Sequence, residues 1–541
     1  MSLISERYSE WLSKNSVSEM SESDKIDSFY RELEFGTGGL RGKIGAGTNR
    51  MNFQTVGRAT FGLAQYLKRK NDCPKIAVAY DSRKYSKEFA ELVAAIMSFR
   101  DIEVYLFSTL TPTPVLSYAV RELKVSAGVV ITASHNPKEY NGYKVYNENG
   151  CQITDKAAKE ITTEISKFGY FEKYKANPEL IHYVGDELLE RFIGQVRKYS
   201  FFEDAYKYAP KIVYTPLCGT GRKPVERLFE KMNISSVIVV KEQEMPDENF
   251  STCPFPNPEE DAALSLAYEY ANKNNAELIL GTDPDADRVG VAERSPDGTI
   301  KRFSGNEVGL ILLDFILKLK KEKGGLSRNS TVIKTIVTSA LGESIAKKYG
   351  VRLINVLTGF KYIGEQIDLL ESENDYIFGF EESCGYLLGS YARDKDSIGA
   401  VMALVEAKAY YKSQNKSLHD ILEDIYNEYG HMITHLDTFM FEGQEGASKK
   451  EKILSYIRNN PFRKVVGRDV KEFIDYKSGV NGLPKSDVME FSGEGFKFII
   501  RPSGTEPKLK IYYFVSNITE DAARTDLQSI RKELSAIIKS A

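Results

Sequence analysis

Short apolar runs alternate with amphipathic helix patterns along most of the chain. Residues 75–80 (KIAVAY) are almost entirely apolar over a length typical of a buried strand. Two more strands are predicted at 102–107 and 127–133. After the first strand the sequence predicts a helix with Ser86 as its N-cap. The apolar positions of this helix recur on one face: Phe89, Leu92, Val93, Ile96 and Met97.

The same alternation of strand and helix returns twice. In a second block, strands are predicted at 211–215, 236–240 and 277–281, with helices near 222–232 and 261–273. In a third block, strands are predicted at 331–337, 352–356 and 376–380, with helices near 340–348 and 360–371. Strands that alternate with helices indicate βαβ units and mainly parallel sheets.

The pattern changes near residue 440. Two strands at 496–500 and 508–515 and a final helix near 519–538 predict a small α+β unit. A chain of 541 residues also exceeds what one hydrophobic core usually covers. We therefore expect an α/β fold with three related mixed or parallel α/β domains and a smaller C-terminal α+β domain around a central cleft. The expected domains are 1–205, 206–303, 304–440 and 441–541.

The composition narrows the function classes. Charged residues make up 28% of the chain, yet the formal net charge is only −3, which argues against a nucleic-acid surface. No apolar run approaches the roughly 18 residues that a membrane span needs, and the polar N-terminus does not resemble a secretory signal. The five scattered cysteines predict neither a disulfide framework nor a zinc site. We expect a cytoplasmic protein without nucleic-acid or membrane partners.

Three polar loops begin where predicted strands end. Ser134 follows the strand at 127–133, Asp283 follows the strand at 277–281, and Glu381 follows the strand at 376–380. Ligands of open α/β sheets bind beyond the carboxyl ends of the strands, so these loops are predicted to share one cleft. The serine is not a hydrolase elbow, because GxSxG is absent. Its loop alone is equally compatible with an ordinary Asn-Pro turn.

The second loop, GTDPDADRVG, places three carboxylates at alternate positions: Asp283, Asp285 and Asp287. Such a set can aim hard oxygen ligands at one cation, and Mg²⁺ or Mn²⁺ suits all-oxygen ligation. A calcium loop of the EF-hand type does not fit, because Arg288 and Arg294 occupy the positions of its glycine and glutamate. An aspartyl nucleophile of a phosphatase and a solvated acidic turn remain open.

Other loops offer groups that could bind a phosphorylated ligand. The segment 501–508 (RPSGTEPK) combines a guanidinium, hydroxyls and a close-approach glycine, as a phosphate-binding loop does. The glycine-rich stretch 34–47 contains Arg41, and Arg83 is predicted to orient the loops of the first domain. In 379–386 carboxylates and a hydroxyl could hold sugar hydroxyls. Each loop read alone is also compatible with a surface turn.

Five motifs occur in order along the chain: GLRG at 39–42, TASHNP at 132–137, DPDADR at 283–288, FEES at 380–383 and RPSGTEP at 501–507. Together they resemble the α-D-phosphohexomutase superfamily, the phosphoglucomutases and phosphomannomutases. The resemblance covers nearly the whole chain, with one motif or more in each expected domain. It implies four domains around a deep cleft and a serine that carries a phosphate.

The resemblance also implies roles for individual residues. Ser134 is expected to be the phosphoserine and, with Asp283, Asp285 and Asp287, to bind one Mg²⁺. The other expected catalytic residues are Lys144 as general acid/base, His135 and Arg41 beside the serine phosphate, and Arg288. The expected substrate-binding residues are Thr358, Gly359, Lys361, Glu381, Ser383, Lys395, Arg501, Ser503, Gly504 and Thr505. An exposed lysine has a pKa near ~10.4, so Lys144 needs a lowered pKa to act as a base.

The expected reaction interconverts glucose 1-phosphate and glucose 6-phosphate, with glucose 1,6-bisphosphate as intermediate and activator. The motifs are similar to those of bacterial phosphoglucomutases of the phosphopentomutase-like branch. A phosphomannomutase or a dual-specificity enzyme is the alternative, and a phosphopentomutase is less favoured. A metal-dependent phosphatase and a non-catalytic sugar-phosphate binding protein are the remaining classes. The expected partners are hexose phosphates, and the chain is expected to be a monomer or a dimer.

Overall fold

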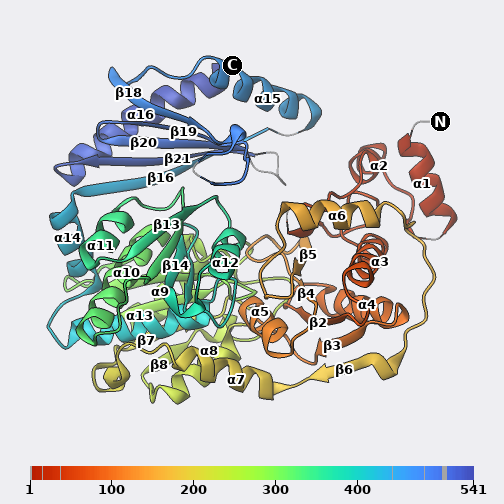
Figure 1. Cartoon of the computed structure of the whole chain (residues 1–541), viewed down its shortest axis with the longest axis horizontal. Helices are drawn as coiled ribbons and strands as arrows, with labels where there is room; N and C mark the ends of the chain where they lie inside the picture. Colours follow the sequence, from red (N-terminus) through yellow and green to blue (C-terminus); the bar gives the residue numbers. More distant parts are fainter. Residues whose placement is uncertain are drawn as a thin grey trace.

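The structure, a computed structural model, describes residues 3–14, 16–36, 38–441, 443–480, 482–502 and 508–540. Four sheets form successive units along the chain, which we call domains I to IV (Figure 1). The fold is the expected one, with three mixed α/β domains and a smaller C-terminal domain. Among the helices of the described ranges, none has the length and apolarity to cross a bilayer.

Domain I has a sheet in the order β1-β5-β4-β2-β3-β6, in which β2 is parallel to both β3 and β4. Its strands are β1 (Gly39–Lys43), β2 (Lys75–Tyr80), β3 (Glu103–Phe107), β4 (Ala127–Ile131), β5 (Tyr140–Tyr146) and β6 (Ile181–Val184). Its helices are α1 (Leu3–Ser13), α2 (Glu22–Phe29), α3 (Phe53–Lys70), α4 (Ser86–Phe99), α5 (Thr113–Glu122), α6 (Asp155–Ile165), η1 (Pro178–Leu180) and α7 (Asp186–Arg197).

Domain II has a sheet in the order β11-β10-β9-β7-β8, with β7 parallel to β8 and β9 and with antiparallel β10 and β11 at one edge. Its strands are β7 (Ile212–Thr215), β8 (Val237–Val239), β9 (Leu278–Thr282), β10 (Val289–Arg294) and β11 (Ile300–Phe303). Its helices are η2 (Glu203–Tyr208), α8 (Arg222–Lys231), η3 (Lys241–Gln243) and α9 (Asp261–Asn274).

Domain III repeats this plan in the order β13-β12-β14-β15, with β12 parallel to β13 and β14 and with antiparallel β15 at the edge. Its strands are β12 (Thr331–Thr335), β13 (Arg352–Val356), β14 (Tyr376–Glu381) and β15 (Gly385–Leu388). Its helices are α10 (Gly305–Glu322), α11 (Leu341–Tyr349), α12 (Phe360–Asp368), η4 (Glu373–Asp375), α13 (Ser397–Lys412) and α14 (Leu418–Tyr429). A parallel centre with an antiparallel edge is thus common to domains I, II and III.

Domain IV has an antiparallel sheet in the order β16-β21-β20-β19-β18-β17. Its strands are β16 (His431–Met440), β17 (Lys464–Val465), β18 (Arg468–Asp475), β19 (Met489–Gly493), β20 (Phe496–Pro502) and β21 (Lys508–Asn517). Its helices are α15 (Gly443–Asn459), η5 (Tyr476–Ser478) and α16 (Glu520–Ser540). Because β16 pairs along its whole length with β21, the expected boundary between 440 and 441 would cut this sheet. We propose that domain IV begins at β16.

The hydrophobic core shows which domains are joined firmly. One continuous apolar cluster contains residues of the sheets of domains I, II and III, and α13, buried along most of its length, contributes to it. Domain IV has a separate core between its sheet and its two helices α15 and α16. In Figure 1 domain IV lies over the β13 end of domain III, away from most of domain I. Domains I to III therefore form one body, on which domain IV rests.

The helix α4 corrects one prediction. Its N-cap is Tyr85, which has a left-handed φ of 64° and makes no side-chain cap. Ser86 is instead the first residue of the helix, and its hydroxyl donates to Asp81 Oδ1 at 2.7 Å. A tertiary acceptor at the end of β2 thus takes the hydroxyl that local capping would otherwise use.

Candidate active site

Ser134 lies just beyond the carboxyl end of β4, in a backbone conformation that few residues adopt. Its φ is +52°, and its backbone N–H donates to Thr132 Oγ1 at 2.8 Å. The side chain is almost fully buried, and its hydroxyl donates to Asp283 Oδ2 at 2.7 Å. His135 Nδ1 lies 3.2 Å from the same oxygen. The loop therefore directs Ser134 at the carboxylates of domain II, as the strand-end argument predicts.

A buried ion pair holds this loop in place. Arg83 lies beside Asp81 at 3.2 Å, and its guanidinium donates to the carbonyl groups of Ser134, Asn136, Pro137 and Tyr140. Asp81 accepts the Thr132 hydroxyl at 2.7 Å. Four carbonyls gathered around one cation fix the path of the serine loop. This confirms the predicted orienting role of Arg83.

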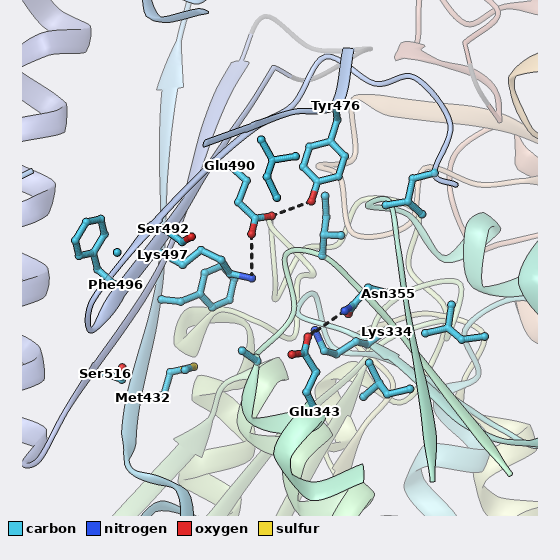
Figure 2. Close-up of a pocket in the computed structure, with 18 of the residues that line it drawn as sticks. Lys334, Glu343, Asn355, Met432, Tyr476, Glu490, Ser492, Phe496, Lys497 and Ser516 are labelled. Atoms are coloured by element: carbon cyan, nitrogen blue, oxygen red, sulfur yellow. Dashed lines mark hydrogen bonds and ion pairs between the residues drawn. The ribbon is translucent and has the colours of Figure 1, made fainter. Parts of the chain in front are cut away.

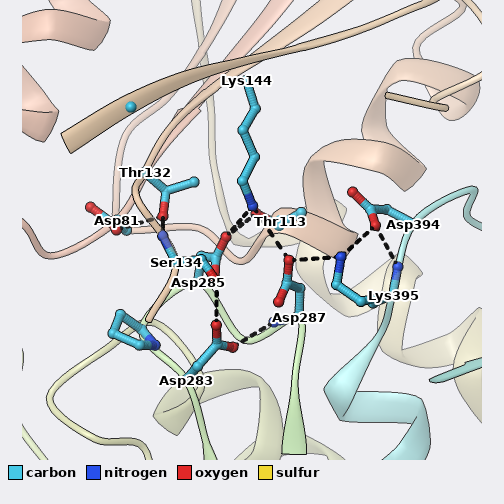
Figure 3. A network of polar contacts seen from close by, with 12 residues as sticks. Asp81, Thr113, Thr132, Ser134, Lys144, Asp283, Asp285, Asp287, Asp394 and Lys395 are labelled. Carbon is cyan, nitrogen blue, oxygen red and sulfur yellow. Dashed lines mark hydrogen bonds and ion pairs between the residues drawn. The ribbon is translucent and has the colours of Figure 1, made fainter. Parts of the chain in front are cut away.

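The three aspartates converge in the loop between β9 and β10 (Figure 3). A carboxylate oxygen from each lies within 4.8 Å of the others, and all three side chains are buried. Asp283 Oδ1 accepts the backbone N–H groups of Asp287 and Arg288, both at 3.0 Å. These bonds turn the short loop back on itself and point the carboxylates into one space.

Two carboxylate oxygens of this loop make no hydrogen bond with the described residues and suit a cation. Asp285 Oδ1 and Asp287 Oδ1 are buried and make no hydrogen bond with the described residues. Burial and the neighbouring carboxylates raise the pKa of Asp283 well above its usual range. Three carboxylates this close are costly without a positive charge between them. The triad could therefore hold a metal ion, with ligand atoms of the type that Mg²⁺ prefers.

Two lysines partly neutralise the triad. Lys144 Nζ lies 2.7 Å from Asp285 Oδ2 and 3.3 Å from Asp287 Oδ2, and Lys395 Nζ lies 3.2 Å from Asp287 Oδ2. Burial lowers the pKa of Lys144, but the two carboxylates outweigh it and the net direction is upward. Lys395 also contacts Asp394 at 3.2 Å. The lowered pKa that a lysine base requires is therefore not present in this arrangement.

Three further predicted catalytic residues surround the serine loop. Arg41 on β1 donates to Asn136 Oδ1 at 3.2 Å. Arg288 forms an ion pair with Glu259 and lies 3.8 Å from Asp287 Oδ1. Burial, with Arg288 and Arg41 nearby, lowers the pKa of His135 well below its usual range. His135 is therefore neutral at physiological pH and can accept or donate a hydrogen bond at Ser134.

The predicted sugar-binding residues come from domain III. Glu381 ends β14, and its Oε1 accepts the Ser383 hydroxyl at 2.8 Å. Thr358 Oγ1 is buried without a hydrogen-bond partner among the described residues, and Gly359 has a φ of +116° that favours glycine. Lys361 pairs with Asp155 of domain I at 3.0 Å, so it bridges two domains.

The predicted phosphate loop of domain IV is described only in part. Arg501 lies near the end of β20 and donates to the Tyr512 hydroxyl at 3.4 Å. Ser503, Gly504 and Thr505 lie outside the described residues.

The structure adds residues that the sequence argument did not single out. Thr113 at the start of α5 donates to Asp285 Oδ2 at 2.9 Å, and its backbone N–H donates to Asp285 O at 2.9 Å. Glu259 holds Arg288, and Asp394 accepts the Tyr146 hydroxyl at 2.7 Å. Thr113 and Glu259 carry no local signal, whereas Asp394 is adjacent to Lys395, which the sequence argument did name.

Comparisons with known proteins agree with this geometry. Models of phosphoglucomutase/phosphomannomutase α/β/α domains I, II and III match residues 32–170, 190–298 and 304–429. A phosphoglucomutase of Staphylococcus epidermidis (strain ATCC 35984) is 37% identical over 529 residues, which cover 94% of this chain and 95% of that protein. A phosphoglucomutase of Staphylococcus aureus (strain MRSA252) is 37% identical over 527 residues, which cover 94% of each chain.

Solved structures share the fold at low identity. The phosphoglucomutase pp63/parafusin of Paramecium, in its open form, has a TM-score of 0.73 at 18% identity, covering 94% of this chain and 95% of its own. A phosphoglucomutase/phosphomannomutase family protein of Burkholderia thailandensis has a TM-score of 0.70 at 16% identity, covering 93% and 97%. Fold and site define a multidomain phosphohexomutase. The chain belongs to the phosphoglucomutase/phosphomannomutase family.

Proposed function

We propose that the chain interconverts α-D-glucose 1-phosphate and glucose 6-phosphate through a phosphoserine at Ser134 and glucose 1,6-bisphosphate. The observation that carries this proposal is the 2.7 Å contact between Ser134 Oγ and Asp283 Oδ2, which joins the serine loop to the carboxylate triad. The relatives named phosphoglucomutase support glucose as the sugar.

Phosphoryl transfer depends mainly on positioning and on neutralising charge at the phosphate oxygens. Asp283, Asp285 and Asp287, with the phosphate on Ser134, would hold one Mg²⁺, whose positive charge would stabilise the transferring group. Asp285 Oδ1 and Asp287 Oδ1, buried and without a hydrogen bond to the described residues, support this choice. Arg41 and Arg288 add guanidinium groups beside the same loop.

Each half of the reaction exchanges one phosphorus–oxygen bond. The bond at Ser134 Oγ breaks as a new bond forms to the free hydroxyl oxygen of the hexose monophosphate. The sugar hydroxyl gives up its proton, and Ser134 Oγ takes one up. We propose Lys144 as the proton donor and acceptor: its ion pairs with Asp285 and Asp287 keep it protonated here, and a cation bound by these carboxylates would lower its pKa. We propose His135 as the partner that orients Ser134 Oγ. The bisphosphate then turns end for end and returns its other phosphate to Ser134.

The remaining residues would hold the sugar and its far phosphate. Glu381, Ser383 and Thr358 present polar groups that suit sugar hydroxyls, beside Gly359, Lys361 and Lys395. Arg501 and the loop that contains Ser503, Gly504 and Thr505 would bind the phosphate that is not being transferred. The cytoplasmic location and the monomeric or dimeric state remain predictions.

One set of assays tests the reaction and the sugar together. The turnover of glucose, mannose and ribose 1-phosphates would be measured with and without added glucose 1,6-bisphosphate. We expect glucose 1-phosphate to have the highest kcat/KM and the bisphosphate to activate the enzyme. A preference for mannose 1-phosphate would indicate the phosphomannomutase alternative. Release of inorganic phosphate as the main product would contradict the mutase and indicate a phosphatase.

A further inference from the structure

A cavity of about 660 Å³ separates domains III and IV, and none of the proposed catalytic or substrate-binding residues lines it (Figure 2). The wall in domain III comes from β12, β13 and α11, and the wall in domain IV comes from β16, β18, β19, β20 and β21 with Tyr476. Its volume lies within the range of sites for small molecules. The cavity is thus large enough for a metabolite.

The cavity lies at the end of domain IV that joins domain III. Gly430 ends α14, and β16 begins immediately after it. Met432 of β16 pairs with Ser516 of β21, and both line the cavity. Phe496, at the start of β20, lines it as well, whereas Arg501 lies near the other end of the same strand. The cavity therefore extends from this end along the face of the sheet to Glu490, which pairs with Ile499, two residues before Arg501.

An apolar contact between domains III and IV adjoins the cavity. It is formed by side chains of both domains: Ile336, Val337 and Leu357 of domain III, and Tyr476, Val488, Ile499, Tyr512 and Phe514 of domain IV. Three of these residues, Ile336, Tyr476 and Phe514, also line the cavity. Domain IV has its own core, so a ligand that bridges the two cavity walls would displace domain IV as a unit relative to domain III. Arg501 belongs to domain IV and would be displaced with it.

The charges that line the cavity favour an anion. Three cationic residues (Lys334, Arg352 and Lys497) and two carboxylates (Glu343 and Glu490) give a net charge of one positive unit, 3 − 2 = +1. Both carboxylates already accept neutral donors: Glu343 accepts Asn355 Nδ2 at 3.0 Å and Glu490 accepts the Tyr476 hydroxyl at 2.9 Å.

Lys334 and Lys497 come from opposite walls. Lys334 is 1% exposed and lies 3.3 Å from Glu343, while Lys497 lies 3.9 Å from Glu490. Burial lowers the pKa of Lys334 to about 8, and the charge of Lys497 contributes to this lowering. The two ammonium groups thus repel each other across the cavity. An anion between them would remove this repulsion and would receive charge-assisted hydrogen bonds.

We propose that this cavity binds a small phosphorylated metabolite, with its phosphate between Lys334 and Lys497, and that its occupancy changes the position of domain IV, with Arg501, relative to domain III. A phosphate group offers several acceptor oxygens, which suits two ammonium groups from different domains. Ser492 and Ser516 supply hydroxyls for the rest of the ligand. The ligand and the substrate would then influence each other's affinity reciprocally.

Hydrogen–deuterium exchange on the whole chain tests the site, with inorganic phosphate and glycerol 3-phosphate as probes. We expect both probes to protect 352–355 and 489–497, and glycerol 3-phosphate to act at lower concentration. These segments are distinct from the proposed active-site segments 132–140 and 281–288, so binding at the two places is separable. Equal potency of the two probes would mean that the site takes free phosphate. Protection of the active-site segments alone would overturn the proposal.

Two charge variants and one matched control localise the effect. K334Q and K497Q should each weaken protection by the probes at least tenfold. Lys497 is partly exposed, so K497Q keeps the test valid if K334Q fails to fold. K471Q removes an exposed lysine of the same sheet, paired with Glu494 at 3.1 Å, and should leave the protection unchanged. Unchanged protection in folded K497Q would contradict the assignment.

A cavity-filling variant tests the movement without a ligand. S492W places a large side chain in the cavity and should change KM for glucose 1-phosphate severalfold. It should also abolish the response of KM to glycerol 3-phosphate. S455W, at an exposed position of α15 in the same domain, is the control and should resemble the unaltered chain. An S492W protein with unchanged KM would show that the cavity does not control domain IV. Binding of the probes is measured by hydrogen–deuterium exchange, so its outcome does not depend on the outcome of the mutase assays.

Discussion

Arg83 and Asp81 form an ion pair from which solvent is completely excluded, with Nε and Oδ2 at 3.2 Å and both side chains 0% exposed. Breaking a buried pair leaves an uncompensated charge, which commonly costs about 3–5 kcal/mol. Here the pair also holds the carbonyl groups of the serine loop.

R83K should therefore lower kcat far more than it changes KM. A lysine keeps the charge, but it lacks the planar fork of donors that gathers four carbonyls. We expect kcat to fall at least a hundredfold, with less phosphate on Ser134 by mass spectrometry. K87Q, in the exposed part of α4, should have neither effect. If R83K kept normal kcat, the loop would not depend on the guanidinium.

S134A and S134T should distinguish the contribution of the Ser134 hydroxyl to activity from the contribution of its backbone conformation. S134A removes the oxygen that carries the phosphate, so mutase activity should be undetectable. S134T keeps a hydroxyl but places a β-branched residue at φ +52°, a strained arrangement that costs about 1–3 kcal/mol. We expect S134T to retain roughly 1–10% of kcat. Labelling from radioactive glucose 1,6-bisphosphate measures both variants, and label on S134A would place the phosphate elsewhere.

Removing divalent cations should destabilise the chain as well as inactivate it. An ion present at a hundred times its Kd adds about 2.7 kcal/mol to the free energy of unfolding. We expect Mg²⁺ to raise the melting temperature of chelator-treated protein and D285N to lose most of this rise. D297N alters a carboxylate in an exposed turn outside the triad and should keep it. Equal stabilisation of both variants by Mg²⁺ would show that the triad is not the ion site.

Stability above neutral pH should depend on Lys334. Its pKa in the folded chain is lowered to about 8 because burial disfavours the charged form. Between pH 8 and pH 10.5 the unfolded chain therefore binds more protons than the folded chain. The free energy of unfolding rises as the pH rises through this window, and this gain is lost as the pH falls from 10.5 to 8. The contribution is about 3–3.5 kcal/mol, at about 1.4 kcal/mol for each pH unit of the window.

K334M should remove this contribution. The difference in the free energy of unfolding between the unaltered chain and K334M would be measured by denaturant titration at pH 7, 8, 9 and 10. We expect the unaltered chain to gain relative to K334M as the pH rises. A difference that stays constant with pH would mean that Lys334 keeps an ordinary pKa.

The sequence predicted the elements and their order because hydrophobic periodicity is a local property. The strand at 75–80 corresponds to β2, and the strand at 352–356 corresponds to β13. The strand-end rule located the loops of Ser134 and Asp283 because parallel strands present their carboxyl ends at one edge. The helix start at Ser86 was wrong as a cap, because a tertiary acceptor, Asp81, takes its hydroxyl.

The amino-acid sequence by itself determined the order of strands and helices, the serine loop and the acidic loop. Only the tertiary structure decided which groups meet: Thr113 with Asp285 across 172 positions, Lys144 with Asp285 across 141, and Lys334 facing Lys497 across a cavity. The reason is physical. Neighbouring residues fix local conformation, whereas contacts between distant residues depend on how separate sheets pack, and no spacing along the chain encodes that packing.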